Sequence, residues 1–299
     1  MIFGFGESSV DEVLVVPELP RAGASKLPVS SSSTRYGGQV ATCMAACAAL
    51  GMPAAYLGPV GDDEHGRALL DVLRTRGVDV SRTIVRPAPT RRAVIMVEET
   101  TGDRLVFWER DPGLDVPVEE LPPGFLDVAT ILHVDVVDER ASMHLAALAR
   151  AQGRTVTCDI DRVTPQAWEF LANVTHPILA SGLPSALTRV DDVRTSLSAI
   201  RTRHAGVLCV TLGDRGAAAL VGDDYVEVPA FTVRAVDTTG AGDVFRAGFI
   251  LGLVKAWPIE ETLRFANAAA AASCTRAGAI DGVPPLEDVW ALIHSLGSP

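Results

Sequence analysis

Long apolar runs and basic clusters are missing from this 299-residue sequence. No apolar stretch reaches the roughly 18 residues that a membrane-spanning helix needs, and residues 1–16 lack the basic start and long apolar segment of a secretory signal. Lysine and arginine form no run longer than the pair Arg91-Arg92, and the formal net charge is −11. Such a chain repels phosphate backbones, so we expect no membrane segment, no export and no binding to nucleic acid.

The cysteines show no C-x-x-C pair and no zinc-ligand spacing. They stand at Cys43, Cys47, Cys158, Cys209 and Cys274. Because Cys43 and Cys47 are four residues apart in a helical pattern, they share one face, where we interpret them as small core residues. Scattered cysteines of this kind are typical of a reducing compartment, so we expect a cytoplasmic protein.

Small and aliphatic residues are abundant: 48% of the residues are hydrophobic although only 5% are aromatic. Strands are predicted at 2–5, 13–16, 54–57, 92–97, 104–108, 131–134, 155–159, 177–180, 207–211, 217–221 and 225–228, and helices at 39–50, 64–76, 139–151, 165–172, 190–203, 243–255, 259–275 and 286–295. The alternation after residue 130 implies right-handed βαβ units and a largely parallel sheet in a single α/β domain over 1–299. The β-rich regions 12–36 and 88–112 break this alternation and predict a small accessory sheet.

The most specific feature is the string DTTGAGD at residues 237–243, which leads into an apolar helical pattern. The N–H groups of Gly240, Ala241 and Gly242 would face a cavity at a helix N-terminus, where free N–H groups and the helix dipole favour an anion such as a phosphoryl group. Asp243 follows in the first turn, where a carboxylate can accept a proton from an attacking hydroxyl. The simpler alternative is a glycine-rich helix start with an acid at its dipole-favoured end.

Residues 237–243 resemble the C-terminal signature of the ribokinase-like (PfkB) carbohydrate kinases. The N-terminal signature of the same family is resembled by Gly37-Gly38 and the small-residue helix that ends at Gly51. GPVGDD at 58–63 and GVD at 77–79 follow it, as in the family. The resemblance covers nearly the whole chain. It implies a three-layer α/β/α fold with a mostly parallel central sheet and a β lid from regions 12–36 and 88–112. It also implies transfer of the γ-phosphoryl group of ATP, with Mg²⁺, to a hydroxymethyl group of a small sugar such as a ketose.

The resemblance implies a role for each matching position. Asp243 matches the catalytic base and Gly240, Ala241 and Gly242 the anion hole. Sugar contacts match Asp11, Gly37, Gly38, Thr42 and Asp135, and nucleotide contacts match Thr211, Gly213, Gly216 and Asn267. In many relatives a monovalent cation, K⁺, lies beside the anion hole, around the positions of Asp237 and the loop 276–281. The lid often forms a dimer contact in relatives, which implies a homodimer.

Two departures from the family pattern bear on the acceptor and on the metal. At the position of Thr42, many relatives have an asparagine that contacts the sugar. At 180–183 the chain has ASGL where relatives often carry Asn-x-x-Glu to organise the Mg²⁺ waters. Either water and phosphate oxygens hold the metal instead, as Mg²⁺ chemistry allows, or turnover is weakened.

The acceptor is open between branches of the family. The chain resembles sulfofructose kinases. That branch would carry basic residues for a sulfonate at the positions of Val137 and Trp108, which are not basic here. Lys26 could serve at a third such position. It also resembles ketohexokinases over 104–116. Arg92 and Arg110 are the lid residues that could reach an anionic acceptor.

Other interpretations compete with the sugar kinase. A nucleoside kinase of the same fold and a catalytically idle regulator that binds sugar or nucleotide fit the same pattern. A dinucleotide-binding oxidoreductase is disfavoured because Ser9 stands at the third glycine position after Gly4-Phe5-Gly6, and no Walker P-loop occurs. Taken singly, Asp11, Asp135 and Asn267 also fit a turn acid, a strand-end acid and a polar helix residue.

Overall fold

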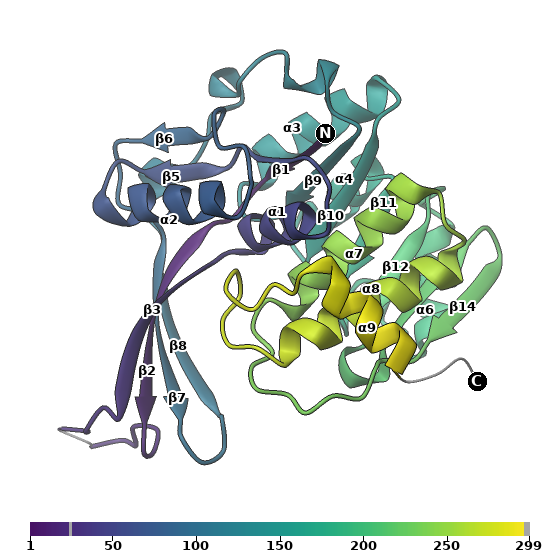
Figure 1. Ribbon diagram of the computed structural model, residues 1–299. Coiled ribbons are helices and arrows are strands. Elements are labelled where there is room, and N and C mark those ends of the chain that lie inside the picture. The colour runs from purple at the N-terminus through teal and green to yellow at the C-terminus, as the bar shows by residue number, and fades with distance from the viewer. Residues whose placement is uncertain (24–25, 296–299) are drawn as a thin grey trace.

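An eight-stranded sheet forms the centre of the computed structural model, which describes residues 1–23 and 26–295 (Figure 1). The strand order is β14-β13-β12-β11-β10-β9-β1-β4, with β12 to β4 mutually parallel and β13 and β14 antiparallel at one edge. The strands are β1 (Ile2–Phe5), β4 (Ala54–Tyr56), β9 (Ile131–Asp135), β10 (Thr155–Ile160), β11 (His176–Leu179), β12 (Leu208–Thr211), β13 (Ala217–Val221) and β14 (Asp224–Val228). The α/β fold with a mostly parallel sheet is confirmed.

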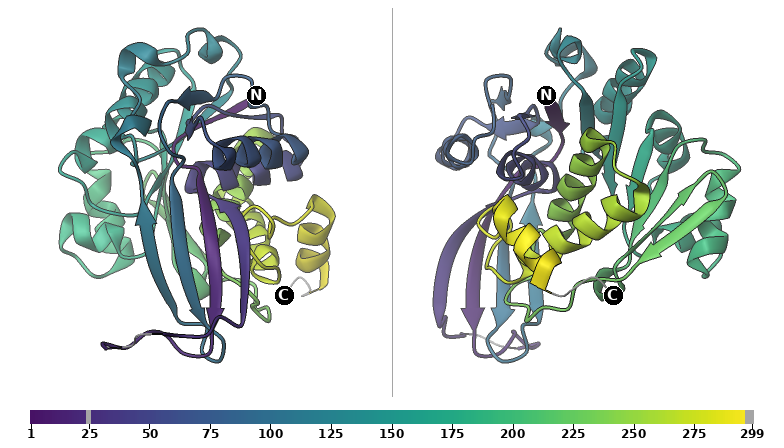
Figure 2. Two further views of the ribbon diagram at one scale, coloured as in Figure 1. Left: turned by 90° about the vertical axis from the view of Figure 1, so that its left-hand side faces the viewer. Right: turned by 45° about the vertical axis from the view of Figure 1, so that its right-hand side comes forward.

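Helices cover both faces of this sheet, which gives three layers (Figure 2). On β1, Ile2 packs into one core, whereas Phe3 and Phe5 pack into the other, because successive side chains of a strand point to opposite faces. The first core is built with α1 (Gln39–Ala49), α2 (Glu64–Thr75), α7 (Ala241–Lys255), α8 (Ile259–Cys274) and α9 (Leu286–Ser295), the second with α3 (Glu139–Ala151), α4 (Ala167–Asn173) and α6 (Val193–Arg201).

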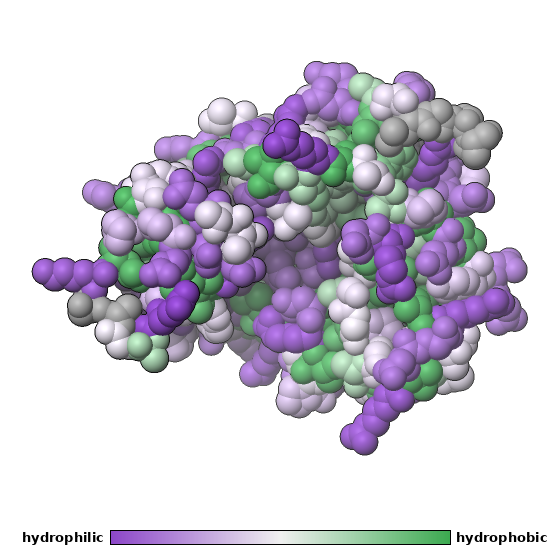
Figure 3. Space-filling view, turned by 90° about the horizontal axis from the view of Figure 1, so that it is seen from below, coloured by the Kyte–Doolittle hydropathy of each residue, from purple (hydrophilic) through white to green (hydrophobic). Residues whose placement is uncertain are grey.

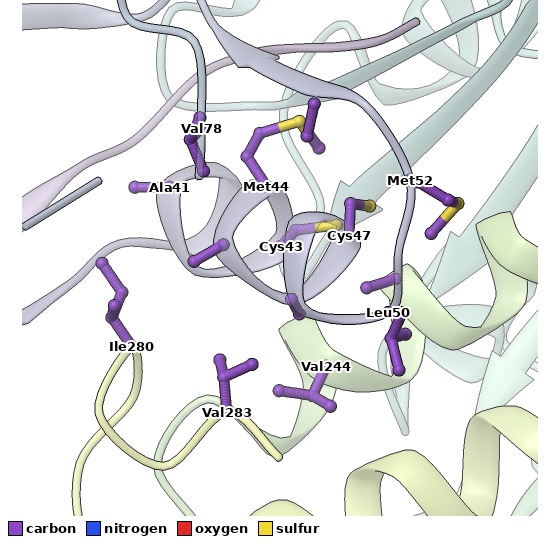
Figure 4. Close-up of a cluster of buried hydrophobic side chains, with 14 of the residues drawn as sticks. Ala41, Cys43, Met44, Cys47, Leu50, Met52, Val78, Val244, Ile280 and Val283 are labelled. Atoms are coloured by element: carbon purple, nitrogen blue, oxygen red, sulfur yellow. The ribbon is translucent and has the colours of Figure 1, made fainter. Parts of the chain in front are cut away.

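The small residues of α1 explain its position. Seven consecutive residues from Ala41 to Cys47 are fully buried, so this helix lies between the sheet and α7. Figure 4 shows Cys43 and Cys47 on this helix among apolar side chains that include Val244 of α7. All five cysteines are free. The interpretation of Cys43 and Cys47 as core residues is confirmed.

A second sheet extends away from the three layers (Figure 1). It contains β2 (Ser9–Val16), β3 (Ser31–Gly37), β7 (Arg92–Glu98) and β8 (Arg104–Glu109) in the order β3-β2-β7-β8, and we call it the lid sheet. The predicted accessory sheet is thus confirmed, although β2 begins at Ser9, so Asp11 lies on a lid strand. Seen from below, a hollow with a mostly hydrophilic floor separates the lid sheet from the three layers (Figure 3).

Short elements account for most differences from the predicted ones. The parallel pair β5 (Pro59–Gly61) and β6 (Ile84–Arg86), the helix α5 (Leu183–Thr188) and the 3₁₀ turns η1 (Pro112–Leu114), η2 (Val118–Glu120), η3 (Phe125–Asp127) and η4 (Gly213–Arg215) were not predicted. Three-residue strands and single helical turns are too short to show a hydrophobic period. The helix predicted from 190 begins at Val193, where Asp192 caps it by accepting the N–H of Thr195 at 2.8 Å. In the described residues, no helix is long and apolar enough to cross a membrane.

Candidate active site

The residues predicted to carry the chemistry gather at the carboxyl edge of the parallel strands. Asp135 ends β9 and Thr211 ends β12, and Asp159, which was not among the predicted residues, lies one residue before the end of β10. In open α/β sheets, ligands bind in the crevice outside this edge. The N-terminus of α7 reaches the same edge, because Arg246 of its second turn contacts Asp159.

The start of α7 leaves its first backbone N–H groups without a side-chain cap. Gly240 precedes the helix with a left-handed φ of 78°, and a Cβ atom there would lie 2.9 Å from the Cα atom of Ala279. Only glycine fits this conformation and this spacing. The helix begins at Ala241, two residues earlier than predicted, so the N–H groups of Ala241 and Gly242 belong to its first turn, as an anion site requires.

Asp243 lies in this first turn beside a buried ion pair. Arg246 donates from Nη2 to Oδ1 of Asp159 at 2.5 Å, and their side chains are 4% and 2% exposed. Burial raises the pKa of Asp243 well above the ordinary value and the charge of Asp159 adds to the effect, while Arg246 opposes both. Asp243 is half-buried as a residue at the helix start, and a carboxyl whose pKa is raised is a strong proton acceptor once it is ionised.

Sequence reasoning missed both members of this ion pair. The available signal was that Arg246 is the only charged residue within 244–254, an otherwise apolar part of α7, and it follows Asp243 by three residues. Residues three apart lie on the same helix face. Asp159 gave no comparable signal, since an acid near a strand end is common. Burial raises the pKa of Asp159 to about 6, and Arg246 opposes the rise.

Several of the residues predicted to contact the sugar lie near Gly240, in the loop before α7. A Cβ atom on Gly37 would be 3.4 Å from Oδ2 of Asp11 and 3.4 Å from Cβ of Ala279. Ala279 in turn packs against Gly240, and so does the methyl group of Thr42, at 3.3 Å from a Cβ placed there. The hydroxyl of Thr42 is buried and has no hydrogen-bond partner among the described residues. Thr42 is 0% exposed, and its contact with the sugar stays a prediction.

Gly38 and Asp135 contact the loops that follow strands β1 and β9. A Cβ atom on Gly38 would lie 2.4 Å from Cα of Ser8, so this turn packs directly on the loop after β1. Asp135 is fully buried and accepts the N–H groups of Glu7 at 2.6 Å and Val137 at 2.9 Å. This geometry makes Asp135 a support that ties two strand-end loops together. Its contact with the sugar stays a prediction.

Arginine–carboxylate pairs line a small cavity between the lid sheet and the strand ends. Arg91 forms an ion pair with Glu7, with Nε 2.7 Å from Oε1, and Arg110 donates from Nη2 to both oxygens of Asp138 at 2.9 and 3.0 Å. Arg92 instead pairs with a glutamate on the lid surface, because alternate residues of a strand face opposite sides. Of the two arginines predicted to reach an anionic acceptor, Arg92 and Arg110, only Arg110 lines the cavity. The other arginine that lines it is Arg91.

The residues predicted to bind nucleotide meet at the turn between β12 and β13. A Cβ atom on Gly216 would lie 2.1 Å from the carbonyl oxygen of Val228. Asn267 of α8 donates to that same oxygen at 3.0 Å and to the carbonyl of Pro229 at 3.1 Å. Gly213, with φ at 64°, has open space around it. The structure thus brings these residues together with Thr211, although the amide nitrogen of Asn267 is already engaged with the backbone.

No dedicated metal cage appears in the part of the chain that the structure describes, since no three metal-ligating side chains cluster there. Residues 180–183 form the turn into α5 and offer no carboxylate for a Mg²⁺ shell. A magnesium ion held by nucleotide phosphates and water stays a prediction.

Comparison with known proteins identifies the relatives of this site. A model of the pfkB family of carbohydrate kinases matches residues 1–286. The chain is 30% identical to fructokinase-1 of Oryza sativa subsp. japonica, covering 99% of this chain and 98% of that protein. It is 28% identical to the ribokinase of Bacillus subtilis (strain 168), covering 96% and 97%. The solved structure of Arabidopsis thaliana ribokinase with ribose and ATP matches with a TM-score of 0.87 at 25% identity, covering 98% of each chain.

Proposed function

This chain belongs to the pfkB family of carbohydrate kinases and is an ATP-dependent sugar kinase, and on that basis we propose that it phosphorylates a hydroxymethyl group of a neutral ketose. One observation carries the proposal: the N-terminus of α7, which no side chain caps, places Asp243 in the same helical turn as the N–H groups of Ala241 and Gly242. We propose a single domain over 1–299 in which the lid sheet faces the three layers across the hollow of Figure 3.

Catalysis follows from these groups. Asp11, Gly37 and Thr42 orient the sugar so that one hydroxymethyl oxygen faces Asp243. Asp243 accepts the hydroxyl proton as the oxygen attacks the γ-phosphorus in line, and the bond to the β-phosphate oxygen breaks to release ADP. The N–H groups of Gly240, Ala241 and Gly242 stabilise the charge on the transferring phosphoryl group. Mg²⁺, bound with the nucleotide, supplies further charge neutralisation on the phosphates.

The acceptor proposal rests on the charge balance of the cavity beside this crevice. Both arginines that line it, Arg91 and Arg110, are already paired with carboxylates, so an anionic sugar would have to displace a partner from each. Carboxylates and paired arginines instead offer alternating acceptors and donors to hydroxyl groups. The curated relatives are fructokinases and a ribokinase, whose names denote neutral sugars.

We expect kcat/KM for fructose to exceed that for fructose 6-phosphate by about tenfold or more, because the phosphate would meet carboxylates whose arginines are engaged. A coupled assay of ADP release with fructose, ribose, fructose 6-phosphate, gluconate and adenosine measures this. Preference for an acid sugar would contradict the charge argument, and preference for adenosine would favour the nucleoside kinase. If ATP binds but none of these acceptors supports ADP release, the result would favour an idle regulator.

The lid sheet also suggests the oligomer. Val106, Phe107 and Trp108 of the edge strand β8 are 48%, 54% and 65% exposed. Successive strand residues face opposite sides, so both faces of this edge present large apolar side chains to water. The closed crevice can cover one face, and we propose that a second copy of the chain covers the other in a homodimer.

Light scattering tests the dimer. We expect the wild type to show twice the 31.5 kDa chain mass and Phe107→Ser to shift the protein toward the monomer, because this change removes a large apolar anchor. Trp108 faces the cavity side, where the guanidinium of Arg91 lies 5.7 Å from its ring centroid, so Trp108→Ser should leave the dimer intact. Val85→Ser on β6, 54% exposed and outside the lid sheet, is the matched control. A monomeric wild type at micromolar concentration would contradict the proposal.

The cysteines support the proposed cytoplasmic location. All five are free, and Cys43, Cys47, Cys158 and Cys209 are buried. Free thiols persist where cellular reductants keep disulfides from forming.

A further inference from the structure

Arg104, on strand β8 of the lid sheet, reaches across to the loop that precedes α7. Its Nη1 donates to Oγ1 of Thr239 at 2.5 Å, and its Nη2 donates to Oγ1 of Thr238 at 3.2 Å and to Oδ1 of Asp237 at 3.3 Å. One side chain of the lid thus binds three consecutive residues of the DTTGAGD string. Asp237 is the residue at which family resemblance implies a monovalent cation.

The carboxylate of Asp237 already accepts four hydrogen bonds, one of them from a guanidinium. Its Oδ1 accepts from the N–H of Thr239 at 2.9 Å, from the hydroxyl of Thr239 at 2.7 Å and from Arg104, and its Oδ2 accepts the N–H of Gly278 at 2.9 Å. Each carboxylate oxygen has about two lone-pair sites, so these donors fill those of Oδ1 and one of Oδ2, and the Arg104 guanidinium would repel a cation at the remaining site. Burial opposes ionisation of Asp237, but the hydrogen bonds from Thr239 and Gly278 outweigh it and lower its pKa. Asp237 is therefore an anion whose charge Arg104 balances.

The second acid of this region is also paired with arginine. Asp281, in the loop 276–281, accepts from Arg35 at 3.3 Å and from Arg76 at 3.3 Å. Arg35 lies on β3, the opposite edge strand of the lid sheet from β8. Both edges of the lid therefore bring a guanidinium to an acid of the region where a monovalent cation was expected, and the residues present do not fit such an ion at Asp237.

We propose that Arg104 takes the place of a monovalent cation: it neutralises Asp237, holds the loop whose N–H groups bind the phosphoryl group, and makes turnover independent of K⁺. The inference rests on the proposed kinase function. It also couples the lid to catalysis, because the charge reaches the loop only when β8 lies against it. Arg104 is a positioning residue, since it contacts the loop and not the sugar.

Steady-state ADP release in tetramethylammonium, Na⁺ and K⁺ buffers of equal ionic strength tests the proposal. We expect the wild-type rate to vary by less than about twofold between these cations. Arg104→Gln should lose about tenfold to a hundredfold, the range for hydrogen bonds to a charged group, and regain part of the loss when K⁺ or guanidinium is added. Arg92→Gln, which removes the same charge from the adjacent strand at an exposed pair, should behave as the wild type.

Strong activation of the wild type by K⁺, or wild-type turnover by Arg104→Gln in tetramethylammonium, would overturn the inference. Thermal unfolding gives a second readout that needs no turnover: K⁺ should raise the Tm of Arg104→Gln but not that of the wild type. If the wild type releases no ADP with any acceptor, the kinase function fails. The thermal readout still decides the inference, because stabilisation of the wild type by K⁺ and not by tetramethylammonium would show an open cation site.

Discussion

Replacing Asp243 with asparagine is expected to lower kcat by about a hundredfold or more and to leave ATP binding nearly unchanged. The amide keeps the shape of the side chain but cannot accept the proton of the attacking hydroxyl. Because α7 begins two residues earlier, at Ala241, its N–H groups remain in place to hold the nucleotide phosphates. Steady-state ADP release and calorimetric titration with ATP measure the two effects separately.

Asp71→Asn on α2, an exposed acid with the same change of charge, is the control and should retain wild-type kcat. Undiminished kcat in Asp243→Asn would remove Asp243 from the mechanism. Loss of ATP binding together with activity would indicate that the substitution disturbs the start of α7 rather than the proton transfer.

Replacing Arg246 with methionine is expected to destabilise the protein by about 3–5 kcal/mol, the usual cost of leaving one member of a buried ion pair alone. Asp159 is 2% exposed and would lose the guanidinium that donates to it. Denaturant unfolding measures the loss. Arg67→Met, which breaks an exposed pair with Asp62, should change stability by no more than about 1 kcal/mol.

The same variant should shift the pH dependence of kcat/KM. Asp243 must be ionised to act as a base, so the rate falls as pH drops through its pKa, which burial already raises. Removing Arg246 takes away the charge that favours the ionised form, so the acid limb should move to higher pH. Since Asp159 and Asp243 interact, the limb reports the pair.

A double variant separates stability from catalysis. Arg246→Met combined with Asp159→Leu replaces the buried pair with apolar side chains and should regain much of the lost stability. It should also relieve the repulsion between Asp159 and Asp243, so the acid limb should return toward lower pH. Unchanged stability and an unchanged limb in the single variant would show that Arg246 and Asp159 do not influence the base.

Arginine pairing explains how a chain with a net charge of −11 can accept ATP. Around the proposed crevice, acids are matched with guanidinium groups: Glu7 with Arg91, Asp138 with Arg110, Asp159 with Arg246, Asp237 with Arg104, and Asp281 with Arg35 and Arg76. In the proposed mechanism, the remaining attraction for phosphate comes from the backbone N–H groups of α7 and from the magnesium that accompanies the nucleotide. Local pairing, and not overall charge, sets the potential that a phosphate meets.

The sequence by itself determined the layered α/β fold, the lid sheet and the start of α7. These features are local: alternating apolar segments, a hairpin signal and a glycine-rich helix start each extend over a few residues. Local backbone preference and burial determine such patterns directly, so the sequence alone reveals them. For the same reason the sequence singled out Asp243, which stands inside a seven-residue string.

Only the tertiary structure decided which side chains meet. Arg246 and Asp159 are separated by 87 residues, and Arg104 and Asp237 by 133. It also decided that Arg91 and not Arg92 faces the cavity, and that Asp135 bonds to backbone N–H groups. Such pairings depend on strand register and on the packing of distant loops, and no local pattern of residues encodes the partner of a charge.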